Sequence, residues 1–344
     1  MSIDLFAILL VVLTLIGVRI AGKAKLFSEN GLDRDQSVAL RGILCIMIML
    51  DHSALLTQAG FSAFFFKKAA FYVVGLFFAL SGYGLTASWQ QGGGSVRGFW
   101  RKRWKGAILP YLLLSVAAAA VRLLLGEKLT LKLALLSFVN GKPLVRYSWF
   151  ILVMIVLYIL FWLSALLARR DRALLLALVG SGALALPFVL RRLGFEEYWY
   201  NAVWTFPVGV LWFFAYPRII SAFRRHPWSY LGLTGLCAAW FVLVAVYFYW
   251  FDYLGMLLST VFVAVFVLLL MLKLRFCNPV LRFLGRISLE IYLLHGIVVT
   301  VLEAFISPKT QPLLFLAVLF PATIVLAWLF HLSYHAVANR SKRG

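Results

Sequence analysis

The chain has 344 residues, of which 64% are hydrophobic and only 13% are charged, and its mean hydropathy is +0.96. This composition excludes a soluble globular protein and indicates a membrane protein made of many apolar helices. The formal net charge is +21 at pH 7. In a soluble protein such a charge would suggest a nucleic-acid partner. The cytoplasmic loops of membrane proteins accumulate Lys and Arg, however, so no nucleic acid is expected.

Apolar stretches long enough to cross a membrane recur along the whole chain. They predict an all-α, polytopic transmembrane helix bundle of about 11 spans, near residues 3–21, 38–57, 65–88, 106–125, 147–168, 173–190, 199–216, 229–250, 253–272, 284–303 and 313–336. We expect one membrane domain over 1–344, in which a first span within 1–22 precedes a bundle over 37–336. No signal-peptide cleavage site follows the first apolar run, so that run is expected to remain as a span.

The basic residues of the loops predict the orientation. Most of the 33 Lys and Arg residues lie in one set of alternate loops, which includes those near 23–41, 97–105, 169–172, 218–225, 273–286 and 340–343. The positive-inside rule places this set in the cytoplasm. With an odd number of spans, the N-terminus is then outside and the C-terminus is cytoplasmic, and the helix near 38–57 runs outward.

The stretch Ala39–Ser53, ALRGILCIMIMLDHS, places ionisable residues in an apolar helix. Arg41 and His52 are eleven residues apart, so at about 100° per residue they share one face, roughly 16 Å apart along the axis. Such a residue inside a span is a functional candidate. His52 could act as a general base or carry an acyl group, or it could be a packing histidine bonded to another helix. Asp51 lies about 100° around the helix from His52, so we expect it to face a cation on another helix, or water.

The stretch Leu284–Gly296, LGRISLEIYLLHG, carries a second group of polar residues within a span. One polar stripe is formed at positions i, i+4 and i+7 by Ser288, Tyr292 and His295. Near mid-membrane, His295 could face His52 or form a hydrogen bond to another helix. Glu290 points away from this stripe.

Three further patterns have simple explanations. His331 and His335 are spaced to bind one metal ion, but the sequence shows no third ligand, so no metal is expected. The segment Ser81–Gly84 is no nucleophile elbow, because no strand precedes it, and its small residues are expected to let helices approach closely. Trp149 lies at an outer membrane interface, where it could anchor its helix or stack on a sugar.

Four stretches, taken together, resemble acyltransferase family 3, a family of bacterial membrane proteins. They are Ala39–Ser53, with Arg, ten residues and His; Phe77–Thr86, FFALSGYGLT; Phe99–Leu112, FWRKRWKGAILPYL; and Leu284–Gly296. They follow the family's order within residues 37–336. The family usually has ten spans, so the span at 3–21 would be an addition. In the third stretch Lys102 and Lys105 stand where the family usually carries Arg-x-x-Arg.

The resemblance implies an O-acyltransferase of the bacterial cytoplasmic membrane. It would move an acyl group, often acetyl, from cytoplasmic acyl-CoA to a hydroxyl of an extracytoplasmic carbohydrate or lipid-linked sugar, without a metal. His52 would be the base and Arg41 would bind or polarise the donor, with Asp51 beside them. The CoA head would bind near Arg101, Lys102, Arg103 and Lys105. Residues near the substrate or behind the catalytic group would be Ser81, Trp149, Glu290, Tyr292 and His295.

Other interpretations stay open from the sequence. Arg41 and the basic stretch also fit ordinary positive-inside residues. The protein could be a carrier or flippase for a lipid-linked glycan, in which the buried polar groups line a route, or a non-catalytic membrane partner of a polysaccharide assembly. Release of CoA from labelled acetyl-CoA, or a labelled acyl-protein, would separate an enzyme from the other two.

Overall fold

The computed structural model describes residues 3–20, 27, 32–60, 70–130, 132–134, 137, 141–247 and 253–340. These residues confirm the predicted all-α bundle. The helices are α1 (Ile3–Leu15), α2 (Arg34–Thr57), α4 (Ala70–Gln91), α5 (Phe99–Arg103), α6 (Leu109–Leu124), α8 (Trp149–Ala168), α9 (Arg172–Arg192), α10 (Thr205–Arg225), α11 (Pro227–Tyr247), α12 (Tyr253–Met271), α13 (Pro279–Arg286), α14 (Ser288–Glu303) and α15 (Pro312–Arg340). A π-helix, η1 (Trp104–Ile108), and a 3₁₀ turn, η2 (Glu197–Trp199), are shorter, and β1 (Val18–Ile20) pairs antiparallel with β2 (Leu274–Phe276).

Each stretch expected to span the membrane contains a helix, but the expected number of about 11 spans is not confirmed. Within the described residues, eight helices are long and apolar enough to cross a membrane, with α5, η1 and α6 counted together. The pair α13 and α14, bent by 73°, makes a ninth if it is counted as one span. The stretch expected as one span at 3–21 is divided into α1 and β1. With 13 residues, α1 is roughly 20 Å long, which is shorter than the hydrocarbon core.

The start of α2 is fixed by contacts from a distant part of the chain. Asp33 caps the helix by accepting a hydrogen bond from the backbone N–H of Gln36 at 2.8 Å. Its other carboxylate oxygen lies 2.5 Å from the guanidinium of Arg275 in β2. The Gln36 side chain also bonds to the backbone of Phe276. These contacts hold the end of α2 that carries Arg41.

Glycine residues let the central helices cross at short distances. A Cβ atom at Gly42 of α2 would overlap the backbone of α13, and one at Gly285 of α13 would overlap the backbone of α2. Gly82 of α4 and Gly209 of α10 form the same kind of crossing. The prediction that small residues in Ser81–Gly84 permit close packing is therefore correct for Gly82.

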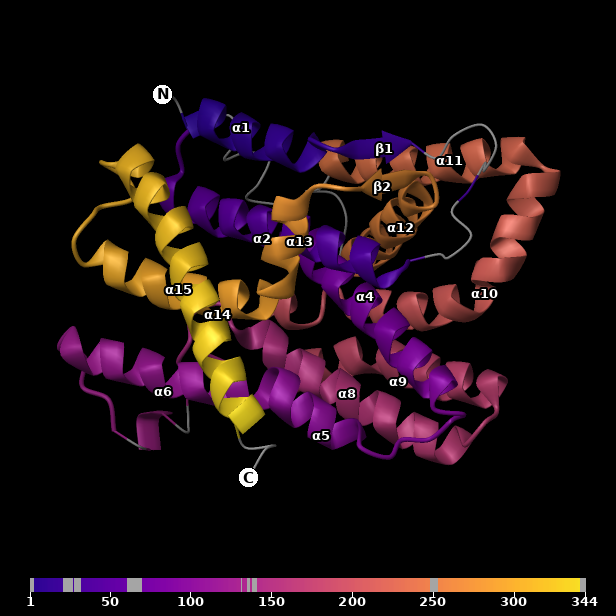
Figure 1. Cartoon of the computed structure of the whole chain (residues 1–344), viewed down its shortest axis with the longest axis horizontal. Coiled ribbons are helices and arrows are strands. Elements are labelled where there is room, and N and C mark those ends of the chain that lie inside the picture. The colour runs from indigo at the N-terminus through magenta and orange to yellow at the C-terminus, as the bar shows by residue number, and fades with distance from the viewer. Residues whose placement is uncertain are drawn as a thin grey trace.

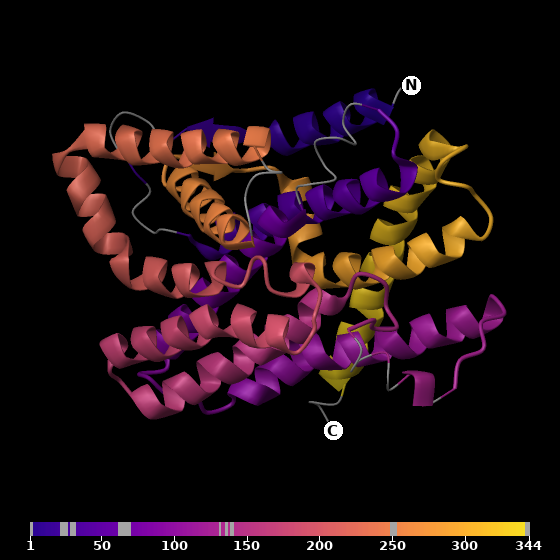
Figure 2. The ribbon, with the colours of Figure 1, turned by 180° about the vertical axis from the view of Figure 1, so that it is seen from behind.

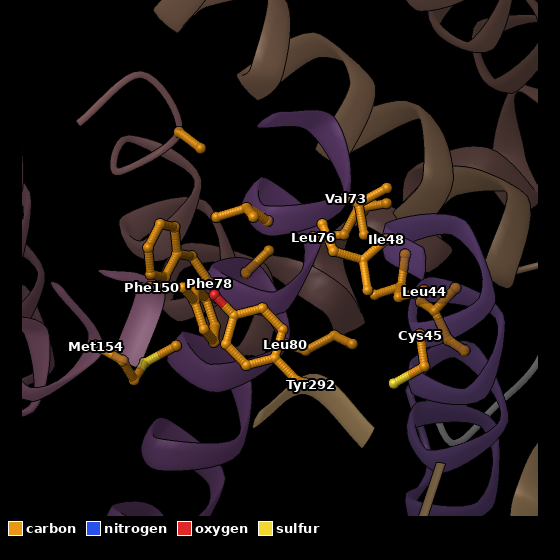
Figure 3. Packing of buried hydrophobic residues seen from close by; sticks show 14 of the residues in the cluster. Leu44, Cys45, Ile48, Val73, Leu76, Phe78, Leu80, Phe150, Met154 and Tyr292 are labelled. Atoms are coloured by element: carbon orange, nitrogen blue, oxygen red, sulfur yellow. The ribbon is translucent and has the colours of Figure 1, made fainter. Parts of the chain in front are cut away.

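The core lies where α2, α4, α8 and α14 meet. Figure 3 shows Ile48 of α2 against Val73 and Leu76 of α4, and Tyr292 of α14 beside Leu80 of α4, and all five are buried. In Figures 1 and 2 the α14–α15 connection and the end of α6 lie on the same side of the bundle as the N-terminus. The strand pair and the corner between α10 and α11 lie on the opposite side.

Candidate active site

Two buried histidines meet between α2 and α14. His52 Nδ1 lies 2.8 Å from His295 Nε2, and the two side chains are 6% and 0% exposed. His295 Nδ1 faces the carbonyl oxygen of Ile291 at 3.3 Å. Because a carbonyl only accepts, this nitrogen carries the proton, and His295 Nε2 then accepts from His52 Nδ1. His52 Nε2 is left with a free lone pair, as a general base requires.

The ring of Tyr147 covers one face of His52. The two rings are stacked with centroids 3.9 Å apart, and the centroids of His52 and His295 are 5.0 Å apart. Tyr147 has a φ of +67°, which is unusual for a residue with a bulky side chain. Its carbonyl accepts a hydrogen bond from the hydroxyl of Tyr292. Gly296 lets this segment pass close to α14. Tyr147 was not predicted as a site residue, because nothing local in the sequence signals its conformation.

Asp51 contacts the start of α4. One of its carboxylate oxygens accepts a hydrogen bond from the backbone N–H of Ala70 at 2.9 Å, and the side chain is fully buried. This direction agrees with the expected 100° rotation away from His52. The backbone N–H of Ala70 is one partner of Asp51, and the expected cation or water stays a prediction. Asp51 therefore holds α2 and α4 together beside the histidine pair.

A cavity of about 320 Å³ lies among α2, α4, α8, α14, the end of α5 and η1. Gly84 and Gly106 line it, and a Cβ atom at either position would meet nothing within 4 Å, so both leave the space open. His52 is not among the lining residues, but Tyr292 is, and its ring centroid lies 5.7 Å from that of His295. Tyr292 thus stands between the cavity and the histidine pair. The polar lining residues are Arg41, Ser81, Arg103, Tyr158, Ser288 and Tyr292.

Two guanidinium groups face this cavity. Arg41 reaches it from α2 and Arg103 from the end of α5, directly before η1. The Arg103 Cζ atom lies 5.2 Å from the ring centroid of Phe99 and 5.3 Å from that of Tyr158, and its buried Nε has no hydrogen-bond partner. In the part of the chain that the structure describes, neither arginine pairs with a carboxylate. The cavity is therefore suited to an anionic ligand.

The basic stretch separates into residues with different surroundings. Arg103 alone of the four predicted donor-binding residues lines the cavity beside Arg41. Lys102 and Arg101 are both exposed, and Lys102 lines a neighbouring cavity whereas Arg101 does not. Lys105 is half-buried, and its carbonyl accepts a hydrogen bond from the hydroxyl of Tyr334 at 2.7 Å. Arg103 is thus better placed to contact a ligand in the first cavity than Lys102 and Lys105, which stand where the family usually carries Arg-x-x-Arg.

Two more cavities continue along α4. The second, of about 270 Å³, shares Leu85 and Arg103 with the first, and the third, of about 340 Å³, shares Trp89 with the second. The buried Nε1 of Trp89 is a donor without a partner. Basic residues line both of these cavities, namely Arg97 and Lys102 in the second and Arg170 and Arg172 in the third. From the sequence, Arg170 and Arg172 were expected only as cations of a cytoplasmic loop.

The remaining predicted residues lie in separate surroundings. Ser81 and Tyr292 line the first cavity. Glu290 does not, and its carboxylate lies 2.7 Å from Nδ1 of His331 on α15. Trp149 packs against the rings of Tyr198 and Trp199, with centroids 5.4 and 6.2 Å away.

Comparison with known proteins gives the family. The family model for the acyltransferase domain of acyltransferase family 3 matches residues 32–332. This range includes the histidine pair, both cavity arginines and all three cavities, and leaves out α1. Searches of curated proteins and of solved structures gave no match. Since the match covers most of the chain, this protein belongs to acyltransferase family 3.

Proposed function

We propose that this membrane acyltransferase takes an acyl group, acetyl in the first instance, from acyl-CoA. It transfers the group to a hydroxyl of a carbohydrate or lipid-linked sugar on the outer side of the bacterial cytoplasmic membrane. The observation that carries the proposal is the line of three cavities with Arg41 and Arg103 at its inner end. A CoA thioester is a long ligand with an anionic head, and it needs cations spread along its path.

The donor enters from the end of α4. The third cavity is lined by the loop residues Gly94 and Arg170 and by Arg172, the first residue of α9. These residues lie at the end of the bundle whose basic loops the positive-inside rule assigns to the cytoplasm. The phosphates bind among the basic residues of the second and third cavities, and the thioester reaches the first. Arg41 and Arg103 there bind the donor, and one of them polarises the thioester carbonyl.

The acceptor reacts at His52. Its Nε2 takes the proton of the acceptor hydroxyl, and the oxygen attacks the thioester carbonyl. When the tetrahedral intermediate collapses, the C–S bond breaks, the ester forms, and the CoA thiolate takes the proton from His52. His295 keeps the lone pair on Nε2 of His52. Because Tyr292 separates the first cavity from the histidines, its side chain must turn aside for the thioester to reach the base. No step in this reaction uses a metal.

A matched pair of variants tests the donor site. Arg103→Gln removes a cation from the cavity, whereas Arg101→Gln removes the same charge from an exposed position of α5. Loss of a charge-assisted hydrogen bond, worth about 1.5–3 kcal/mol, should weaken acetyl-CoA binding by roughly 10- to 150-fold. We expect this in Arg103→Gln and no change in Arg101→Gln, measured by equilibrium binding of labelled acetyl-CoA. Equal affinities in both variants and the wild type would refute the donor site.

A further inference from the structure

A second cluster of ionisable side chains joins α14 to α15, outside the donor cavities. His331 Nδ1 lies 2.7 Å from a carboxylate oxygen of Glu290, and the ring centroids of His331 and His335 are 4.3 Å apart. One ligand atom from each of the three residues lies within 4.8 Å of the others. The sequence offered the two histidines alone. The fold adds the carboxylate of a residue 41 positions away.

We propose that Glu290, His331 and His335 bind one Zn²⁺ ion. Imidazole nitrogens and a carboxylate oxygen are ligands that zinc takes at about 2.0–2.2 Å, which puts tetrahedral ligand atoms roughly 3.3–3.5 Å apart. The ligand atoms lie within 4.8 Å of one another, so small side-chain rotations would bring them to this spacing. The two histidines lie one turn apart on the same face of α15. Two nitrogen ligands favour zinc over Mg²⁺ or Ca²⁺, which prefer oxygen.

The surroundings suit a cation with an open fourth position. Glu290 is 7% exposed and lies in an apolar helix, where its negative charge needs a positive partner. His331 is half-buried and His335 is exposed, so the ring of His335 can turn to close the site and water can complete the tetrahedron. The cluster therefore has a buried charged side and an accessible side through which an ion enters.

The bound ion holds α14 in position against α15, and α14 carries part of the proposed reaction site. Glu290 is two residues before Tyr292 and five before His295 on α14. None of the three ligands lines a donor cavity. Zinc here stabilises the contact between α14 and α15 and takes no part in acyl transfer. This inference does not depend on the proposed donor.

The experiment measures zinc binding by the whole protein, purified in detergent without a polyhistidine tag and stripped of metal. Isothermal titration with ZnCl₂ should give one ion per chain with micromolar or tighter affinity, and zinc should raise the melting temperature on the order of 5 °C. His335→Ala keeps the hydrogen bond between Glu290 and His331 but removes a ligand, so affinity should fall at least tenfold. Glu290→Gln should also lose the thermal shift.

His226→Ala is the matched control. His226 lies exposed between α10 and α11, away from the cluster, and its loss should leave zinc affinity at the wild-type value. The absence of stoichiometric zinc binding in the wild type would overturn the proposal. Wild-type affinity in both His335→Ala and Glu290→Gln would also overturn it, because the ion would then bind elsewhere.

Discussion

The histidine pair makes a specific prediction about His295. His295 Nε2 lies 2.8 Å from His52 Nδ1, and as the acceptor of that N–H it keeps the lone pair on the other nitrogen of His52. His295→Leu removes this acceptor and leaves a buried donor unsatisfied, which costs about 1–3 kcal/mol. If this energy is added to the activation free energy of acyl transfer, kcat should fall by about 5- to 150-fold. The KM for the donor should not change, because His295 does not line the donor cavity.

The conservative variant separates positioning from packing. The side-chain oxygen of Gln can accept the same hydrogen bond, so His295→Gln should recover most of the kcat that His295→Leu loses. The assay is release of CoA thiol with acetyl-CoA and a saturating acceptor, with the melting temperature measured for each variant. Equal kcat values in the two variants, or a wild-type value in His295→Leu, would refute this role for His295.

Three further variants and one topology test examine other parts of the structure. Gly84→Leu should fill the donor cavity and raise the KM for acetyl-CoA without lowering the melting temperature, and an unchanged KM would mean that the donor binds elsewhere. Tyr292→Phe removes the hydrogen bond to Tyr147, so kcat should fall a few-fold through a loss of about 1 kcal/mol; an unchanged kcat would show that this bond does not support catalysis. Gly209→Val forces a side chain into the backbone of α4 and should destabilise the protein by about 1–3 kcal/mol, seen as a lower melting temperature, whereas an unchanged one would contradict the tight crossing. Reporter fusions at the two ends should fall on opposite sides of the membrane, and two reporters on one side would contradict an odd number of spans.

The sequence predicts the helices and one face of α2 well, because both depend on local periodicity. Apolar runs of about 20 residues locate spans, and a separation of eleven residues puts Arg41 and His52 on one face. The polar stripe on α14 also indicated that His295 could face His52. Both properties depend only on composition and helical geometry within one element.

Other parts of the site depend on tertiary contacts that no local pattern shows. The positive φ of Tyr147 is held by α14, far away in the sequence. Among the basic residues, the π-helix η1 inserts one extra residue per turn, so the α-helical phase does not tell which of 101–105 faces the cavity. Arg170 and Arg172 look like ordinary loop cations until the end of α4 is placed beside them.

The most direct test of the central claim is acyl transfer by the purified protein and by His52→Ala. The protein, in lipid nanodiscs, is given acetyl-CoA labelled in the acetyl group and a glycolipid or polysaccharide fraction from a bacterial envelope. The account predicts release of CoA thiol, with label entering the carbohydrate fraction as an ester that alkaline hydroxylamine removes. In His52→Ala both should fall by roughly 10²-fold or more while donor binding persists. Transfer at the wild-type rate by His52→Ala would contradict it. Binding of acetyl-CoA by the wild-type protein without any release of CoA would also contradict it.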